Sequence, residues 1–118
     1  MEQEKNKKSM TLAEFAKACH STNDYSDDAV KANALFLGLA GEAGEAAEQA
    51  KKCMRDDNCR WTPERAKAAA MEVFDVMWYA TQVIWSLGYS IDDVAQMGLD
   101  KLARRKADGK IHGEGSNR

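Results

Sequence analysis

The stretch EVFDVMWYATQVIWSL, residues 72–87, decides the fold of this chain. Two apolar stripes follow it at steps of three and four, the spacing of a helix that is apolar nearly all round. They consist of Val73, Val76, Ala80, Val83 and Leu87, and of Phe74, Trp78, Thr81 and Trp85. The narrow seam left over consists of Glu72, Asp75, Tyr79 and Gln82. Such a helix belongs at the centre of a bundle, so the sequence predicts an all-α fold.

Helix-capping signals divide the rest of the chain. Thr11 and Glu14 have the spacing of a capping box, Thr62 precedes a proline, and Ser90 precedes two acids. About four helices are therefore expected, over residues 11–21, 28–55, 62–87 and 90–108. No strand pattern competes with them. The two long central helices are expected to carry the functional residues.

Apolar residues at helical spacing predict the inward faces of two of these helices. On the second helix they are Leu35, Leu39, Ala43, Ala46, Ala50 and Cys53. On the fourth helix they are Ile91, Val94, Ala95 and Leu102. We expect one all-α domain over residues 11–109, a disordered end over residues 1–10, and a polar tail over residues 110–118 that could close over a ligand.

Two acidic pairs have the same three-residue step: Glu42 with Glu45, and Glu72 with Asp75. Residues three apart share one helix face, so each pair aims two carboxylates in one direction. No lysine or arginine lies between Lys67 and Lys101 to neutralise the second pair. If the two helices face each other, four carboxylates converge, and a divalent cation is the simplest compensation for their repulsion.

The residue types indicate which cation is expected. Carboxylate di-iron bundles use a Glu-x-x-His pair, whereas His20 and His112 lie near the ends of this chain. Oxygen-only ligation favours a hard ion, so magnesium is predicted and manganese is an alternative. Glu48 continues the acidic row and is either a further acid of the site or ordinary surface. A solvated acidic face without any metal is the competing interpretation of the whole cluster.

Composition restricts the class of protein. The chain is 44% hydrophobic and 31% charged, with a net charge of −2, which fits a globular protein and predicts no binding to nucleic-acid polymers. No apolar run suits a signal peptide or a membrane span, so a cytoplasmic location is expected. The three cysteines, Cys19, Cys53 and Cys59, predict reduced thiols, with a bridge between the last two as the alternative.

The motifs also carry a family resemblance. LGLAGEAGE at residues 37–45 and EVFDVMWYA at residues 72–80 resemble a MazG-like protein, a family of the all-α nucleoside triphosphate pyrophosphohydrolases. The tail segments KLARRK at residues 101–106 and GEGSNR at residues 113–118 are similar to the endings of compact members. The resemblance implies magnesium-dependent cleavage of a nucleoside or deoxynucleoside triphosphate between its α and β phosphates, giving the monophosphate and pyrophosphate. Nucleotide-pool house-cleaning is one role it suggests.

Roles for individual residues follow from this resemblance. It implies that Glu42, Glu45, Glu72 and Asp75 are metal ligands, and that Glu42, Glu45 and Glu48 serve the catalysis, Glu48 by orienting the attacking water. Cations expected to hold phosphates are Lys51, Lys52, Lys101 and Arg104. Asn117 and Arg118 could close over the ligand, and Trp61 could stack on a base. The competing interpretation of the cations and of Trp61 is solvated surface and packing.

Association of chains is expected because the third helix needs more cover than its neighbours can give. A homodimer in which long helices of two subunits form the bundle is predicted, with a homotetramer as the alternative. Two other functions compete with the main hypothesis. One is a catalytically silent helical module that binds metal, nucleotide or a partner protein. The other is a pyrophosphohydrolase specific for phosphoribosyl-ATP or for pyrimidine nucleotides.

Overall fold

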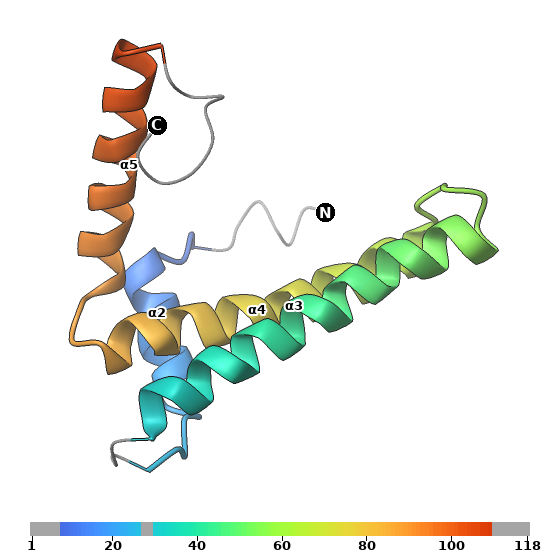
Figure 1. The fold of residues 1–118 in the computed structure, drawn as a ribbon. Coiled ribbons are helices and arrows are strands. Elements are labelled where there is room, and N and C mark those ends of the chain that lie inside the picture. The colour runs from blue at the N-terminus through green and yellow to red at the C-terminus, as the bar shows by residue number, and fades with distance from the viewer. Residues whose placement is uncertain (1–7, 27–29, 110–118) are drawn as a thin grey trace.

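Helices make up the regular structure of the computed structural model, which describes residues 8–26 and 30–109. In chain order they are α2 (Leu12–His20), α3 (Lys31–Asp56), α4 (Pro63–Ser86) and α5 (Ile91–Ala107) (Figure 1). The described residues contain no strand, so the all-α prediction is confirmed for this part of the chain. The predicted end at residues 1–10 falls mostly outside the described residues, as do the tail at residues 110–118 and the expected start of the second helix at Asp28.

The helix starts lie where the capping signals predict them. Thr11 Oγ1 accepts a hydrogen bond from the Glu14 amide at 3.1 Å, and the Glu14 carboxylate accepts one from the Thr11 amide at 3.3 Å. The Thr62 and Ser90 hydroxyls cap α4 and α5 by accepting hydrogen bonds from the Arg65 and Asp93 amides, each at 3.1 Å. These side chains satisfy backbone amides that a first helical turn leaves unpaired. Sequence alone therefore placed three helix starts correctly.

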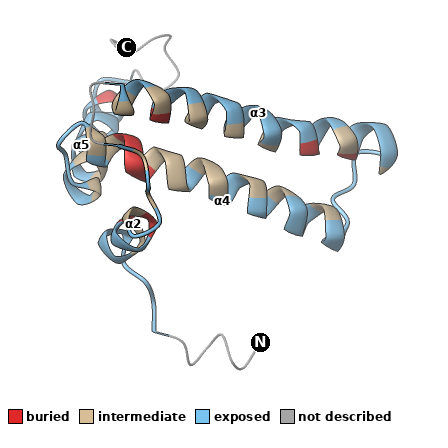
Figure 2. Ribbon diagram, turned by 90° about the horizontal axis from the view of Figure 1, so that it is seen from below, coloured by how far each residue is buried: buried red, intermediate tan, exposed pale blue. Residues whose placement is uncertain are grey.

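The two long helices, α3 and α4, form an antiparallel hairpin and run side by side along most of their length (Figures 1 and 2). Short α2 packs against α4, and α5 contacts α2 and α4 at the open end of the hairpin. Within the described residues α3 contacts α4 alone. The outer half of the hairpin, which ends at the turn between α3 and α4, therefore stands clear of the other helices.

The inward face of α3 differs from the predicted one. It consists of buried and half-buried residues at heptad spacing: Leu35, Leu39, Glu42, Ala46, Gln49 and Cys53. Ala43 and Ala50, predicted to lie inward, are exposed, because Glu42 and Gln49 occupy those places in the seam. Gln49 is tolerated there because its side-chain oxygen accepts a hydrogen bond from Arg65 at 3.3 Å. Glu42 belongs to the acidic cluster described below.

A single chain covers α4 only in part, as expected for a helix that needs more cover than its neighbours give. It is buried only around one turn near its C-terminal end, at Thr81, Gln82 and Val83. Val73 and Met77, however, are exposed. On α5, Leu102 is exposed as well, although it was predicted to lie inward. The exposure of α4 and of Leu102 has one cause, since α2 and α5 gather at one end of the hairpin and cover little of its length.

Gln82 holds α2 and the loop after it against α4. This side chain is fully buried, and its oxygen accepts a hydrogen bond from Asn23 at 2.9 Å. The same oxygen lies 2.9 Å from His20 Nδ1, and the His20 ring stacks on Trp85 with centroids 3.8 Å apart. No pattern in the sequence predicted a role for His20, whose ring here helps to hold α2 against α4. His112 lies outside the described residues.

Candidate metal centre and its pocket

The predicted acidic pairs do converge across the α3–α4 hairpin. Glu42, Glu45 and Glu72 each offer a carboxylate oxygen, and these oxygens all lie within 4.8 Å of one another. The spacing follows from the fold, because Glu42 and Glu72 are seam residues of facing helices and Glu45 lies one turn after Glu42. Three hard oxygen donors at this separation suit a divalent cation.

Glu42 has the most unusual environment of the acids. Its Oε2 atom is buried and has no hydrogen-bond partner among the described residues. Burial raises the pKa of its carboxyl, and the negative charge of Glu45 raises it further. The charges of Asp75 and then Glu72 act in the same direction. A buried carboxylate oxygen without a donor normally costs free energy, and a cation would remove that cost, so these residues fit a metal ion.

This environment predicts how stability depends on pH without metal. The unfolded pKa of a glutamate is near the ordinary 4.5, and the folded pKa of Glu42 lies above it. Between these values the native state binds more protons than the unfolded state, so the contribution of Glu42 to the free energy of unfolding falls as pH rises through this window. In chelator, the free energy of unfolding measured with urea should fall less from pH 4 upward in Glu42→Gln than in the parent. Equal slopes would contradict this environment for Glu42.

Asp75 lies beside the three glutamates rather than within the tightest cluster. It lines a pocket of about 280 Å³ together with Glu42, Thr22, Phe74, Trp78 and Tyr79. The wall is fixed by a hydrogen bond of 2.9 Å from Trp78 Nε1 to Thr22 Oγ1, which ties the loop after α2 to α4. Carboxylates on one side and aromatic rings on the other make this pocket suitable for a ligand with a charged part and a flat part.

Tyr79 connects the pocket to the loop after α2. Its hydroxyl lies 3.0 Å from that of Tyr25, and the two rings meet edge to face. The hydrogen bond with Tyr25 and burial raise the pKa of Tyr79 to about 12, with smaller contributions from Glu42 and Asp75. The phenol therefore stays protonated at neutral pH, and it can donate a hydrogen bond near the acids.

Gly38 and Gly41 offer a matched test of this packing. A Cβ on Gly38 would overlap the Tyr79 ring, whereas one on Gly41 would meet open space. We expect Gly38→Ala to lower the free energy of unfolding by about 1–3 kcal/mol through overpacking. Gly41→Ala should raise it by up to about 1 kcal/mol, because alanine is the better helix former. Chemical denaturation measures both changes in the free energy of unfolding. Equal changes would show that the Tyr79 ring moves aside without a free-energy cost.

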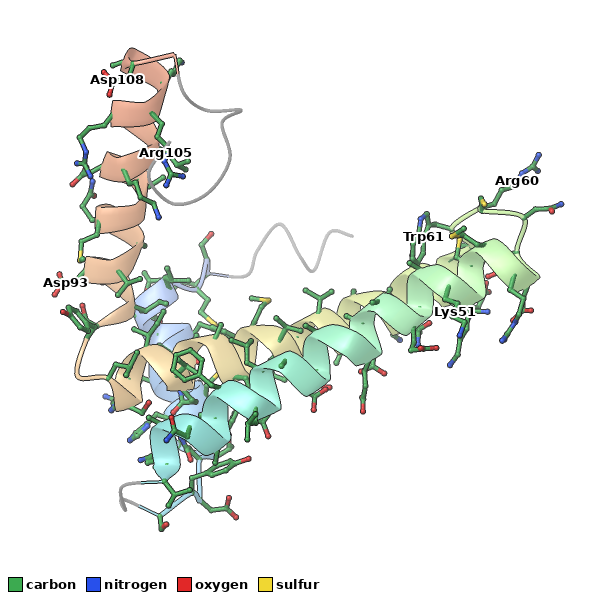
Figure 3. All side chains as sticks on the ribbon, viewed as in Figure 1. Lys51, Arg60, Trp61, Asp93, Arg105 and Asp108 are labelled. Carbon is green, nitrogen blue, oxygen red and sulfur yellow. The ribbon has the colours of Figure 1, made fainter. Side chains whose placement is uncertain are left out.

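The remaining residues predicted on the hairpin lie farther from the acids. Glu48 is exposed, one turn beyond Glu45 on the same helix. Lys52 is half-buried and Lys51 exposed, near the end of α3. Trp61 is exposed at the hairpin tip (Figure 3). The α4 axis from Pro63 to Glu72 spans roughly 14 Å at 1.5 Å per residue, so one chain does not bring the Trp61 ring to its own acids.

The cations predicted on the fourth helix form a separate feature. Lys101 and Arg104 line a pocket of about 430 Å³ with Val94, Met97, Gly98 and Asp100. Because α5 contacts α2 and α4 but not α3 in the described residues, this pocket is not part of the acidic cluster in one chain. Asn117 and Arg118 lie outside the described residues. The phosphate-holding role of Lys101 and Arg104 remains a prediction, as does the closing of Asn117 and Arg118 over the ligand.

The loop after α2 contributes to the pocket, and the sequence analysis did not predict this. Thr22 and Tyr25 come from that loop, and they contact Trp78 of the predicted apolar stripe and Tyr79 of the predicted seam. A signal was present for Tyr79, which follows Asp75 by one helical turn and so shares its face. No comparable signal marks Thr22 or Tyr25, because their contacts join residues more than fifty positions apart.

Comparison with known proteins places the chain in a family. No family model matches it, and no solved structure matches it. Over 84 residues it is 43% identical to the Gene 37 protein of Mycobacterium phage L5, an alignment that covers 71% of this chain and 74% of the phage protein. The chain belongs to the family of this phage protein. Membership of the Gene 37 family brings no substrate or reaction with it, so function must be argued from the acidic site.

Proposed function

We propose that the protein is a magnesium-dependent nucleoside triphosphate pyrophosphohydrolase. The observation that carries the proposal is the buried, unpartnered Glu42 oxygen in a cluster whose carboxylate oxygens lie within 4.8 Å. Stability alone does not favour such a cluster, because unpaired like charges repel. The motif resemblance to MazG-like proteins supplies the reaction, which is cleavage between the α and β phosphates.

The acidic cluster has a definite part in this reaction. Glu42, Glu45 and Glu72 would hold the ion from both helices of the hairpin, and Asp75 would complete the set from the adjoining turn of α4. Magnesium, or manganese in its place, supplies positive charge to phosphate oxygens and lowers the pKa of an attacking water. Glu48 is exposed one turn farther along α3, from where its carboxylate could accept a proton from that water.

The pocket beside the cluster supports a nucleotide as the ligand. Phe74, Trp78 and Tyr79 give it an aromatic wall, on which a flat base can stack. This wall lies next to Glu42 and Asp75, whereas Trp61 lies at the hairpin tip. We therefore assign base stacking to the aromatic residues of α4 instead of Trp61. The candidate phosphate contacts are still Lys51, Lys52, Lys101 and Arg104.

Other partners are restricted by the fold and the charge. Within the described parts of the chain, none of the helices has both the length and the apolar character needed to cross a membrane. The net charge of −2 gives no general attraction for nucleic-acid polymers. A single nucleotide and further copies of this chain are the partners that we propose.

A panel of canonical, deoxy and modified triphosphates incubated with magnesium tests the proposal. Product chromatography should find a monophosphate and pyrophosphate for at least one nucleotide, and neither product in chelator. Phosphoribosyl-ATP and pyrimidine nucleotides in the panel distinguish the narrower pyrophosphohydrolases. Orthophosphate as the product would refute the cleavage position. No turnover, together with metal binding that Glu72→Gln leaves unchanged, would instead support a catalytically silent module.

A further inference from the structure

A second pocket lies where α2 meets the end of α4 and the start of α5 (Figure 1). Its volume is about 540 Å³, larger than that of the pocket beside the acids, and the two pockets share no lining residue. Small-molecule sites in proteins have volumes of roughly 300–1,000 Å³. We name this cavity the α2–α5 pocket, and its size fits a small ligand.

Small side chains on α2 leave this space open. Ala13 and Ala16 are three residues apart, so they share one face of the helix, and both line the pocket. Opposite them the chain turns from α4 into α5 through Gly88, whose φ of 86° lies in the left-handed region that glycine adopts without strain. Because α2 presents alanines to this turn instead of large apolar side chains, the gap between them is not filled.

Contacts between α2 and α4 hold the pocket wall in place. Gln82 Nε2 donates a hydrogen bond of 3.4 Å to the Ala16 carbonyl, and Gln82 is fully buried. The His20 ring lies against Trp85, which lines the pocket. On the α5 side, the Ser90 hydroxyl caps the helix and fixes where it starts. These contacts are made by the chain itself, so the pocket is formed before a ligand binds.

Two aromatic side chains supply surfaces for a flat ligand. Trp85 is 41% exposed and Tyr89 is 54% exposed, and both line the pocket. The His20 ring covers one face of Trp85, since the two ring planes differ by only 6°. The exposed area of Trp85 therefore belongs to its other face and its edge. Aromatic side chains that line a pocket can stack on a flat ring, which makes an aromatic ligand the best match.

The pocket also has one charge of each sign. Lys17 of α2 and Asp92 of α5 both line it. Neither side chain forms an ion pair with the other or with any further residue of the described ranges. Each charge suits its own helix, because Lys17 is in a last turn and Asp92 is in a first turn. That preference does not explain why both border one apolar cavity without pairing.

We propose that the α2–α5 pocket binds a small aromatic zwitterion, the chemical class of an aromatic amino acid. The ring of the ligand stacks on Trp85 and Tyr89, its carboxylate faces Lys17, and its ammonium group faces Asp92. A purely apolar ligand would leave both charges without a partner, and an aromatic anion would leave Asp92 without one. The assignment rests on the match between these two charges and the ligand. This inference does not depend on the proposed reaction.

A titration followed by nitrogen-15 NMR of the parent tests the proposal with three indole compounds. L-Tryptophan has both charges, indole-3-propionate lacks the ammonium group, and tryptamine lacks the carboxylate. Tryptophan at millimolar concentration should shift the amide resonances of Ala16, Gly88 and Tyr89 until they saturate. Its Kd should be roughly twofold to fivefold lower than that of either analogue, the range expected for one exposed ion pair.

Charge variants should separate the three compounds further. Lys17→Gln should weaken tryptophan and indole-3-propionate by roughly twofold to fivefold and leave tryptamine unchanged. Asp92→Asn should weaken tryptophan and tryptamine and leave indole-3-propionate unchanged. Lys8→Gln is the matched control, because Lys8 is exposed and lies outside the pocket. It should bind all three compounds as the parent does.

A variant that fills the pocket gives a second, independent test. Ala13→Trp should abolish the saturable shifts with all three compounds. Ala18→Trp should bind like the parent, because Ala18 is exposed on the same helix but does not line the pocket. Circular dichroism checks that both variants keep their helices, and the charge variants decide the question if Ala13→Trp does not fold.

Several results would overturn the proposal. They are the absence of saturable shifts with tryptophan, equal affinity for the three compounds, and tryptophan binding that both Lys17→Gln and Asp92→Asn leave unchanged. If the same resonances moved when the protein was diluted without any compound, another copy of the chain would occupy the pocket, which would also contradict it.

Discussion

Glu72→Gln is expected to lower kcat/KM for pyrophosphate release roughly 10³-fold, which corresponds to several kcal/mol of lost charge stabilisation in the transition state. Glutamine has almost the same shape as glutamate, so the substitution removes a negative charge while it preserves packing in the seam. Glu72 offers one of the carboxylate oxygens that lie within 4.8 Å of one another, and it comes from the helix opposite Glu42 and Glu45. Steady-state kinetics with saturating magnesium measures the effect.

A matched control separates this loss from a general effect of charge. Glu64 lies in the first turn of the same helix, near the hairpin tip, and is exposed. Glu64→Gln should retain parental kcat/KM. Glu48→Gln should lose less activity than Glu72→Gln if Glu48 only assists the attacking water. A Glu72→Gln enzyme within threefold of the parent would remove Glu72 from the proposed site.

Magnesium is expected to raise the melting temperature of the parent by on the order of 10 °C at a hundred times its dissociation constant. Binding to the native state alone at that concentration adds about 2.7 kcal/mol to the free energy of unfolding. For a domain of about a hundred residues, each kcal/mol corresponds to roughly 4–8 °C. The gain is expected because the cation compensates both the burial and the carboxylate repulsion that raise the pKa of Glu42. Differential scanning calorimetry in magnesium and in chelator measures it.

Sodium chloride at matched ionic strength is the control for charge screening, which also weakens repulsion between carboxylates. Glu72→Gln should respond to magnesium much less than the parent, and in chelator it should be at least as stable because it has one charge fewer. If sodium chloride raised the melting temperature as much as magnesium does, the cluster would be an acidic surface rather than a metal site.

Local signals in the sequence were sufficient to predict where the helices start and that the acidic pairs converge. Thr11, Thr62 and Ser90 cap helices through contacts three residues away, which the sequence displays directly. The three-residue steps of the acidic pairs likewise fix their direction on each helix. With one short turn between α3 and α4, the helices had to be antiparallel neighbours, so the pairs could meet.

Contacts between segments that are distant in the chain could not be predicted from the sequence. The assumption that apolar residues lie inward assigned Ala43 to the seam, whereas the heptad spacing places Glu42 there. The Tyr25–Tyr79 contact depends on how the loop after α2 crosses α4, and no local pattern encodes that path. The separation of Lys101 from the acids follows from where α5 packs, which is equally non-local.

The most direct test of the central claim is phosphorus NMR of a triphosphate that the protein turns over, recorded with magnesium for the parent and for Glu72→Gln. The expected result is that the parent produces pyrophosphate and the nucleoside monophosphate in equal amounts, that chelator stops their appearance, and that Glu72→Gln forms them roughly 10³-fold more slowly. A nucleoside diphosphate with orthophosphate, or pyrophosphate formed equally fast by Glu72→Gln, would contradict it.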